Sequence, residues 1–197
     1  MASTTSTSSM PRLAPLGDAS WLRLLQGSIG LGVASVVVLG YLVLFTTTVD
    51  QGDFHHAADY WLTATGLPLA VAGIGIAFGV HRLQHGADGR LGTIGVWINI
   101  VALVELFAQL LVSVLVAAEV RWGPSYPVFT LLSFVGVALL AAGSWRTGLL
   151  PKWMLGVWPL VWIIGSLAAQ GPTPFLLVVF LAAFGVTLTR RVRNRVG

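Results

Sequence analysis

The chain of 197 residues contains no cysteine, and only 9% of its residues are charged. Without cysteine, disulfides, thiolate catalysis and cysteine-ligated metal sites are excluded. A soluble domain typically carries about 25% charged residues, because its surface must face water. The low charge therefore excludes a water-soluble globule of this size. With 56% hydrophobic residues and a mean hydropathy of +0.85, the composition predicts an integral membrane protein.

Six apolar runs follow one another along the chain, separated by short polar segments. A helix needs roughly 20 residues to cross the hydrocarbon core of a bilayer, within a common range of about 17–25. The runs cover residues 24–49, 60–80, 91–118, 128–145, 153–170 and 174–189. Strands of alternating polarity, which a membrane β-barrel needs, are missing. The sequence therefore predicts an all-α fold, an integral membrane bundle of six transmembrane helices.

The two ends of the chain differ from this apolar middle. Residues 1–20 are rich in Ser, Thr and Pro and cannot bury a core, which predicts a disordered cytoplasmic tail. Residues 21–190 form the predicted six-helix transmembrane domain, and residues 191–197 a short basic cytoplasmic tail. We therefore expect a single membrane domain between two tails.

Basic residues are distributed unevenly among the segments that join the predicted helices. If the N-terminus is cytoplasmic, ten of the eleven Lys and Arg residues fall in cytoplasmic segments, and only Arg121 lies outside. Cytoplasmic loops of membrane proteins carry an excess of Lys and Arg, so we expect both termini in the cytoplasm. The bias toward Arg over Lys, with abundant Ala, Gly and Val, indicates a bacterial chain of the inner, cytoplasmic membrane.

One carboxyl group interrupts the third apolar run. Glu105 lies near the middle of residues 91–118 and so near the middle of the bilayer. An ionised carboxylate at that depth costs about 2.5–3.5 kcal/mol on insertion scales. We therefore expect Glu105 to face the bundle interior and to be largely protonated. Gln109 and Ser113 follow at i+4 and i+8, so Glu105, Gln109 and Ser113 form a candidate intramembrane polar site.

Two interpretations of Glu105 stay open. As a functional group, it binds a proton or a substrate inside the membrane. As a structural group, its protonated carboxyl hydrogen-bonds a neighbouring helix. No Lys or Arg lies within an apolar run to neutralise it, and the polar side chains available as partners are Ser35, Asn99, Ser133 and Ser166.

A weaker candidate cluster lies in the acidic segment after the first apolar run. It combines histidines and aspartates, whose side chains suit Zn or similar ions: His55, His56, Asp50, Asp53 and Asp59. The spacing matches no established motif, so the favoured interpretation is a solvated loop without metal. His81 and His85 lie four residues apart at the other end of the second run, where a helix would carry both rings on one face.

Small and aromatic residues predict how the helices pack. Gly75 and Gly79 form a G-x-x-x-G pattern in the second run, which allows a neighbouring helix to approach closely. Trp158 and Trp162 lie four apart in the fifth run. They either line a pocket for an apolar or cationic ligand or pack in the core.

The motifs of soluble enzymes are missing. The sequence has no G-x-S-x-G, no S-x-x-K and no Walker-type phosphate loop. We therefore expect no catalytic residues and no cofactor. We also expect no nucleic-acid partner, because the basic residues are scattered among the apolar runs, where membrane topology explains them. The leading hypothesis is a non-enzymatic bundle in the lipid bilayer that binds a membrane-protein partner, a second copy or a small apolar ligand. A small proton-coupled secondary transporter that uses Glu105 is the alternative, and an intramembrane enzyme the second alternative.

Residues 143–165 read GSWRTGLLPKWMLGVWPLVWIIG. This stretch resembles a feature of uncharacterised bacterial polytopic membrane-protein families, in which one helix ends at Arg-Thr-Gly and Leu-Pro-Lys/Arg-Trp opens the next. Gly148 suits the end of the first helix and Pro151 the start of the second. The resemblance implies a membrane protein of unknown function and carries over no site residues.

The predicted topology can be tested with reporter fusions. Fusions after Gln51, Gly86, Gly123, Gly148 and Gly171 are expected to alternate outside, inside, outside, inside, outside, because each is separated from the next by one predicted crossing. Two consecutive fusions on the same side would contradict the six-span topology.

Overall fold

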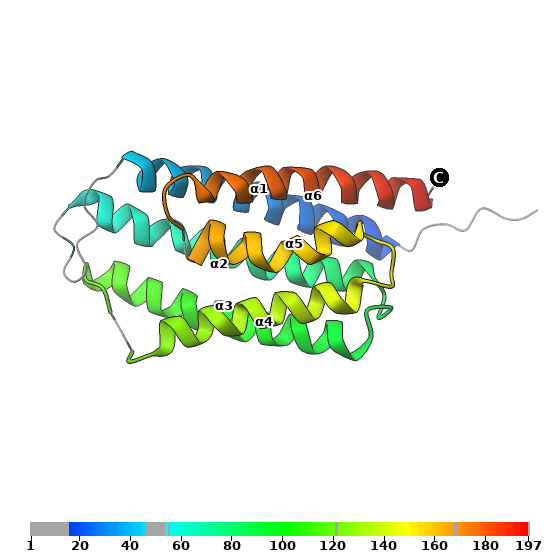
Figure 1. Ribbon diagram of the computed structural model, residues 1–197, viewed down its shortest axis with the longest axis horizontal. Helices are drawn as coiled ribbons and strands as arrows, with labels where there is room; N and C mark the ends of the chain where they lie inside the picture. The colour runs from blue at the N-terminus through cyan, green and yellow to red at the C-terminus, as the bar shows by residue number, and fades with distance from the viewer. Residues whose placement is uncertain (1–15, 46–53, 55, 121, 168, 197) are drawn as a thin grey trace, which may run out of the picture.

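The computed structural model describes residues 16–45, 54, 56–120, 122–167 and 169–196. These residues form six α-helices and no β-strand (Figure 1). The predicted all-α fold is therefore confirmed. The helices are α1 (Leu16–Phe45), α2 (Ala57–Leu83), α3 (Gly89–Val116), α4 (Ser125–Ser144), α5 (Lys152–Trp162) and α6 (Thr173–Val196), and a π-helical turn, η1 (Ile163–Leu167), directly continues α5.

Five helices are long and apolar enough to cross a membrane: α1, α2, α3, α4 and α6. The fifth apolar run is shorter, because α5 and η1 together cover Lys152–Leu167. At about 1.5 Å per residue this segment reaches about 24 Å, less than the roughly 30 Å of a hydrocarbon core. Pro159 lies inside α5 and has no backbone N–H to donate, and the π-helical turn follows four residues later.

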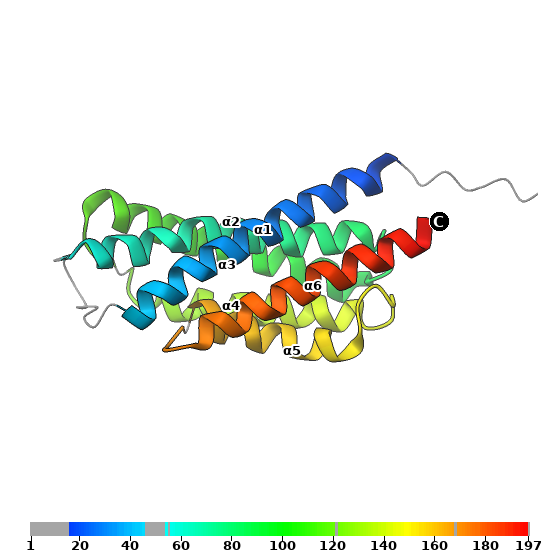
Figure 2. The same ribbon diagram turned by 90° about the horizontal axis from the view of Figure 1, so that it is seen from above.

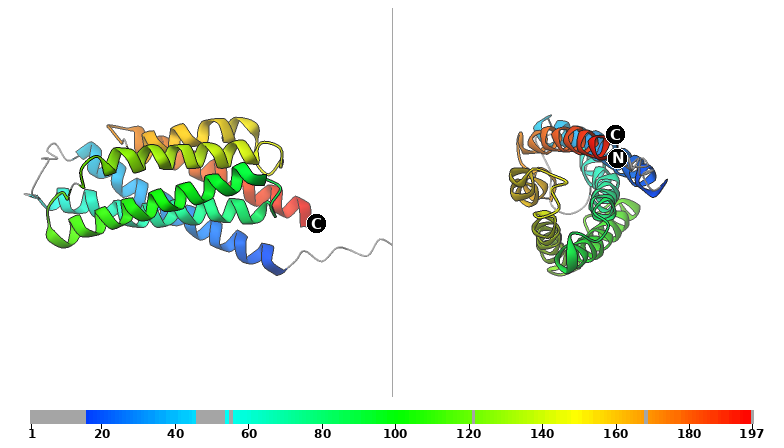
Figure 3. Two further views of the ribbon diagram at one scale, coloured as in Figure 1. Left: turned by 90° about the horizontal axis from the view of Figure 1, so that it is seen from below. Right: turned by 90° about the vertical axis from the view of Figure 1, so that its right-hand side faces the viewer.

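The helices form one bundle and lie around it in chain order, as the end-on view shows (Figure 3). The last helix, α6, closes the ring by packing beside α1 (Figure 2). The start of α1 and the end of α6 lie at the same end of the bundle. We call this end the terminal end and the other the loop end.

The boundaries of the two predicted tails differ from those of the helices. α1 begins at Leu16, within the expected N-terminal tail, and residues 1–15 lie outside the described residues. α6 continues to Val196, so nearly all of the expected basic tail belongs to that helix. Polar residues at the ends of a membrane helix extend it beyond the hydrocarbon core, where hydropathy no longer marks its limits.

The glycines of α2 pack against α1, as their spacing predicted. A Cβ atom on Gly75 would lie 2.0 Å from the Ser28 hydroxyl oxygen, and one on Gly79 would lie 3.1 Å from Cβ of Leu25. A larger residue at Gly75 therefore has no room. The close contact belongs to the packing within one chain.

The α3–α4 pair approaches even more closely. A Cβ on Gly95 would lie 2.4 Å from the backbone N of Leu140, and one on Gly136 would lie 2.6 Å from the backbone N of Asn99. Toward the terminal end, a Cβ on Gly143 would lie 2.6 Å from the backbone N of Gly92. Backbone cannot move aside as a flexible side chain can, so these glycines fix the distance between the two helices.

This contact yields a stability prediction. Gly136→Ala is expected to destabilise the bundle by about 1–3 kcal/mol through overpacking against α3. Gly156→Ala is the matched control, because Gly156 also lies within a helix but has nothing within 4 Å of a Cβ. It should stabilise by about 0.5–1 kcal/mol, the ordinary gain of Ala over Gly in a helix. Melting temperatures in detergent compare the two, and equal values would contradict the close α3–α4 approach.

Candidate functional site

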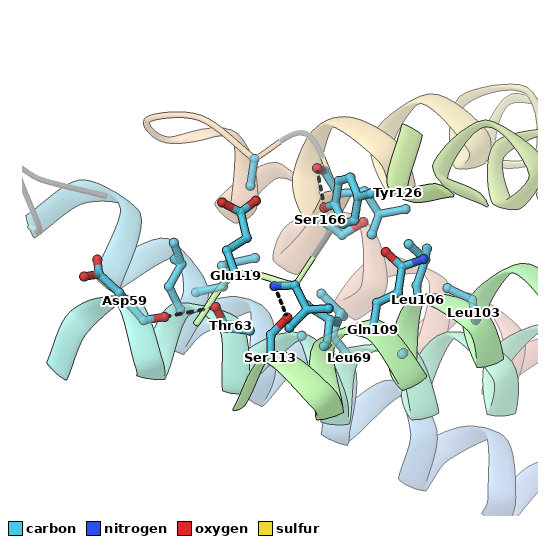
Figure 4. A pocket seen from close by; sticks show the side chains of 18 of the residues that line it. Asp59, Thr63, Leu69, Leu103, Leu106, Gln109, Ser113, Glu119, Tyr126 and Ser166 are labelled. Atoms are coloured by element: carbon cyan, nitrogen blue, oxygen red, sulfur yellow. Dashed lines mark hydrogen bonds between the residues drawn. The ribbon is translucent and has the colours of Figure 1, made fainter. Parts of the chain in front are cut away.

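A cavity of about 730 Å³ lies inside the loop end of the bundle. Its volume falls within the roughly 300–1,000 Å³ typical of small-molecule sites. Side chains from α1 to α4 and from the α5–η1 segment line it, and Figure 4 shows them from close by. Most of the wall is aliphatic, with leucines from four of these elements: Leu39, Leu62, Leu69, Leu103, Leu106, Leu110 and Leu167.

Trp162 lies at the inner end of the cavity. Its side chain is buried and packs on the backbone of Gly73, where a Cβ would lie 2.6 Å from the indole ring and 2.8 Å from Cδ1 of Leu103. The absence of a side chain at Gly73 therefore makes room for the indole. Trp162 limits the cavity toward the middle of the bundle.

A hydrogen-bond chain holds this indole in place. Trp162 Nε1–H donates to the Ser133 hydroxyl (3.2 Å), and the Ser133 hydroxyl donates to Oδ1 of Asn99 (2.9 Å). All three side chains are buried, and they come from α5, α4 and α3. Buried polar groups are costly unless they are bonded. The chain therefore ties three helices together at one depth.

Gln109 provides a polar group within the otherwise aliphatic wall. Its side chain is only 3% exposed, and its amide Nε2 has no hydrogen-bond partner among the described residues. Figure 4 shows the amide between Leu106 and Ser113, deeper in the cavity than Asp59. An unpaired buried amide costs roughly 1–3 kcal/mol. The described residues therefore leave one buried polar group of the cavity wall without a partner.

The third residue of the predicted polar stripe has a structural partner. Ser113 is buried, and its hydroxyl accepts a hydrogen bond from the backbone N–H of Val120 (3.0 Å). This bond holds the segment after α3 against the cavity wall. Ser113 and Gln109 therefore lie in the same cavity, as their i, i+4 spacing predicted, but have different roles.

Acidic and aromatic side chains surround the cavity at the loop end of the bundle: Asp59, Glu119 and Tyr126 (Figure 4). Asp59 is 2% exposed, and its Oδ2 accepts a hydrogen bond from the backbone N–H of His56 (3.0 Å). Its Oδ1 has no partner among the described residues. The Tyr126 hydroxyl donates to the carbonyl of Leu167 (3.2 Å), which links α4 to η1. Two carboxylates here disfavour an anionic ligand.

Glu105 does not line this cavity. Glu105 is partly exposed on α3. Of its neighbours on this helix, Val101 and Val104 are exposed and Leu106 is buried. Its carboxyl makes no hydrogen bond with a described residue, whereas Asn99 and Ser133, two of the expected partners, bond each other. Glu105 therefore lies on a partly exposed side of α3 and outside the cavity.

Only two members of the acidic loop cluster, His56 and Asp59, belong to the described residues. Asp50, Asp53 and His55 lie outside the described residues, and Asp59 caps the start of α2. A carboxylate in the first turn of a helix interacts favourably with the helix dipole. Among the described residues, no group of three His, Cys, Asp or Glu side chains is placed to hold a metal ion.

The second histidine pair does not share a helix face. α2 ends at Leu83, and His85 adopts a left-handed backbone conformation (φ 50°) in the turn that follows. His81 instead pairs with the buried Asp88, with Nδ1 and Oδ2 2.6 Å apart. The two imidazole rings do not share a helix face, contrary to what their i, i+4 spacing predicted, because the helix ends between the two residues.

The two tryptophans of the fifth run have different surroundings. Trp162 lines the cavity, whereas Trp158 packs against Phe184 of α6 with ring centroids 5.1 Å apart. Trp158 therefore packs in the core, while the use of Trp162 to bind a ligand stays a prediction. Tyr126 and Glu119 also line the cavity, but neither belongs to a sequence motif that predicts a site.

The hydrogen-bond chain at the inner end can be tested through its central residue. Ser133→Ala removes the acceptor of Trp162 and the donor to Asn99, and interhelical bonds of this kind each contribute about 0.6–1.7 kcal/mol in membranes. We expect a loss of about 1–3 kcal/mol in the thermal stability of the purified protein. Ser35→Ala is the control, because Ser35 is equally buried but bonds only Leu31 of its own helix. Equal effects would show that the interhelical chain adds nothing.

No family model, curated protein or solved structure matches the chain. The resemblance of residues 143–165 to polytopic membrane-protein families stays a prediction.

Proposed function

We propose that this protein is a non-enzymatic membrane protein that binds a small, mainly apolar molecule in the cavity at the loop end of its bundle. The observation that supports this most directly is the buried Gln109 amide, whose Nε2 has no partner among the described residues of an aliphatic cavity of about 730 Å³. Ligand pockets typically combine apolar walls with a few polar groups that orient the ligand.

The lining also restricts the chemistry of the ligand. An amide has both donors and an acceptor, so a hydroxyl or a carbonyl group can bond to Gln109. The leucines favour an aliphatic or aromatic body, and the carboxylates of Asp59 and Glu119 favour a neutral or cationic molecule over an anion. The proposed ligand is therefore lipophilic, not anionic, and carries at least one hydroxyl or carbonyl.

The proposal includes six crossings of the bacterial inner membrane with both termini in the cytoplasm. The distribution of Lys and Arg supports this orientation, and the common position of the two helix ends at one end of the bundle agrees with an even number of crossings. The α5–η1 segment then crosses as a short helix. The cavity opens toward the outer side.

Two other functions have less support. A proton-coupled transporter with Glu105 as carrier has less support, because Glu105 is not among the residues that line the cavity. An enzyme needs a nucleophile beside a base. Among the described lining residues, the Ser166 hydroxyl donates to the carbonyl of Trp162, and no histidine lies nearby to activate it.

Binding can be measured with an aminonaphthalene ketone dye, which has an aromatic body and one carbonyl. We expect saturable binding to the protein in lipid nanodiscs and weaker binding to Thr63→Trp, because an indole on the cavity wall takes up part of the space. Thr93→Trp is the matched control. Both hydroxyls bond the carbonyl four residues earlier, but Thr93 is exposed at the other end of the bundle. Equal binding by the two variants would refute a site in this cavity.

The role of Gln109 has its own prediction. Gln109→Leu keeps the cavity apolar and removes the amide, so the ketone dye should bind more weakly by about 0.5–1.5 kcal/mol, the typical net value of one hydrogen bond. Its emission should also shift to the blue, because the carbonyl loses a donor. An analogue with an alkyl group in place of the acyl group should bind both proteins equally. A similar loss for both dyes would assign Gln109 a role in shape only.

A further inference from the structure

Glu105 has a carboxyl group that pairs with no other described residue of the bundle. The residue lies near the middle of α3, partly exposed, and its carboxyl has no hydrogen-bond partner among the described residues. In a bilayer, the outer face of α3 at this depth meets hydrocarbon, which cannot hydrogen-bond. Intramembrane carboxyl groups are costly and as a rule face protein or a water-filled space. The outer face of α3 at Glu105 therefore needs a polar partner.

The residues that share this face follow a regular pattern. Starting at Ile94, successive members are four, three, four, three and four residues apart: Ile94, Ile98, Val101, Glu105, Ala108 and Val112. We call this set the Glu105 stripe. All of its members are exposed or partly exposed, with Ile94 at 50% and Val101 at 59%. Alternating steps of three and four residues place these members on one face of the helix, and this is the spacing along which a second helix can pack in a left-handed coiled coil.

The stripe is separate from the face with which α3 packs in its own bundle. That inner face carries Ala102, Leu106 and Gln109, all buried. The exposed apolar residues of the stripe need no explanation by themselves, since lipid tails are as apolar as they are. The carboxyl at the centre of the stripe does need an explanation. In a coiled coil, a single polar residue in the seam fixes the register in which the two helices pair.

We propose that the Glu105 stripe is the contact surface of a parallel homodimer, in which the Glu105 carboxyl groups of two copies hydrogen-bond each other. A neutral carboxyl has one O–H donor and a carbonyl acceptor, so two of them satisfy each other without any other residue. All copies insert with the same orientation, and a two-fold axis along the membrane normal therefore brings both Glu105 residues to the same depth. An unrelated partner would need a polar group of its own at that depth.

The absence of cysteine allows a direct test by cross-linking. In lipid vesicles at low protein density, Val101→Cys is expected to form an intermolecular disulfide on mild oxidation, because a seam position faces its counterpart in the second copy and a disulfide needs the two Cβ atoms about 3.5–4.5 Å apart. Val186→Cys is the matched control. Val186 is also a mid-helix valine, 52% exposed, but it lies on α6, across the ring from α3 (Figure 3). Equal cross-linking of the two variants, or none at Val101, would overturn the proposal.

The role of the carboxyl is tested in the Val101→Cys background. Glu105→Leu removes the paired hydrogen bonds and should weaken dimerisation by roughly 3- to 30-fold, as measured by cross-linking against lipid dilution. Glu105→Gln retains a donor and an acceptor and should dimerise as the parent does. Melting temperatures in detergent verify that both variants fold. Unchanged dimerisation in Glu105→Leu would refute the Glu105 contact, and ligand binding in the cavity is a separate result that neither outcome affects.

Discussion

The hydrogen bond from the Trp162 indole to the Ser133 hydroxyl is the interaction on which the shape of the cavity depends. α5 is the shortest helix of the bundle and is interrupted by Pro159 before η1 begins. The indole bond and the one from Tyr126 to η1 are polar ties that set the depth of the segment beside α4, because apolar contacts discriminate weakly against sliding in an apolar solvent. Because Ser133 also bonds Asn99, the indole is fixed relative to α3 as well.

The bundle combines close packing with an internal cavity. At mid-depth and toward the terminal end, glycines of α3 and α4 bring backbone against backbone, and Gly75 of α2 packs against the Ser28 side chain of α1. At the loop end the helices keep large leucines on their inner faces but still enclose about 730 Å³. The close helix contacts at mid-depth and at the terminal end stabilise the bundle. The loop end can therefore keep an unfilled volume and an unpaired amide.

α3 contributes to both proposed sites through two polar residues four positions apart. Successive residues on a helix are separated by about 100°, so Glu105 and Gln109 differ by about 40° in direction. That rotation is enough to bury Gln109 in the cavity wall and to leave Glu105 partly exposed. A polar stripe that looks continuous in sequence is thus divided between the interior and the outer surface of the bundle.

The sequence by itself determined the all-α class, the positions of the apolar helices and the contact made by Gly75, because hydrophobic length and small-residue spacing are local properties. It did not determine which side of α3 faces inward. In water, the apolar side of a helix identifies its buried face, but lipid is as apolar as a protein core, so this signal is lost. Only the packing of α3 between α2 and α4 decided that Gln109 and Ser113 are buried while Glu105 is not. Trp162 was likewise assigned to the cavity, and Trp158 to the core, by the positions of α4 and α6, because nothing in the residues themselves distinguishes two tryptophans one turn apart.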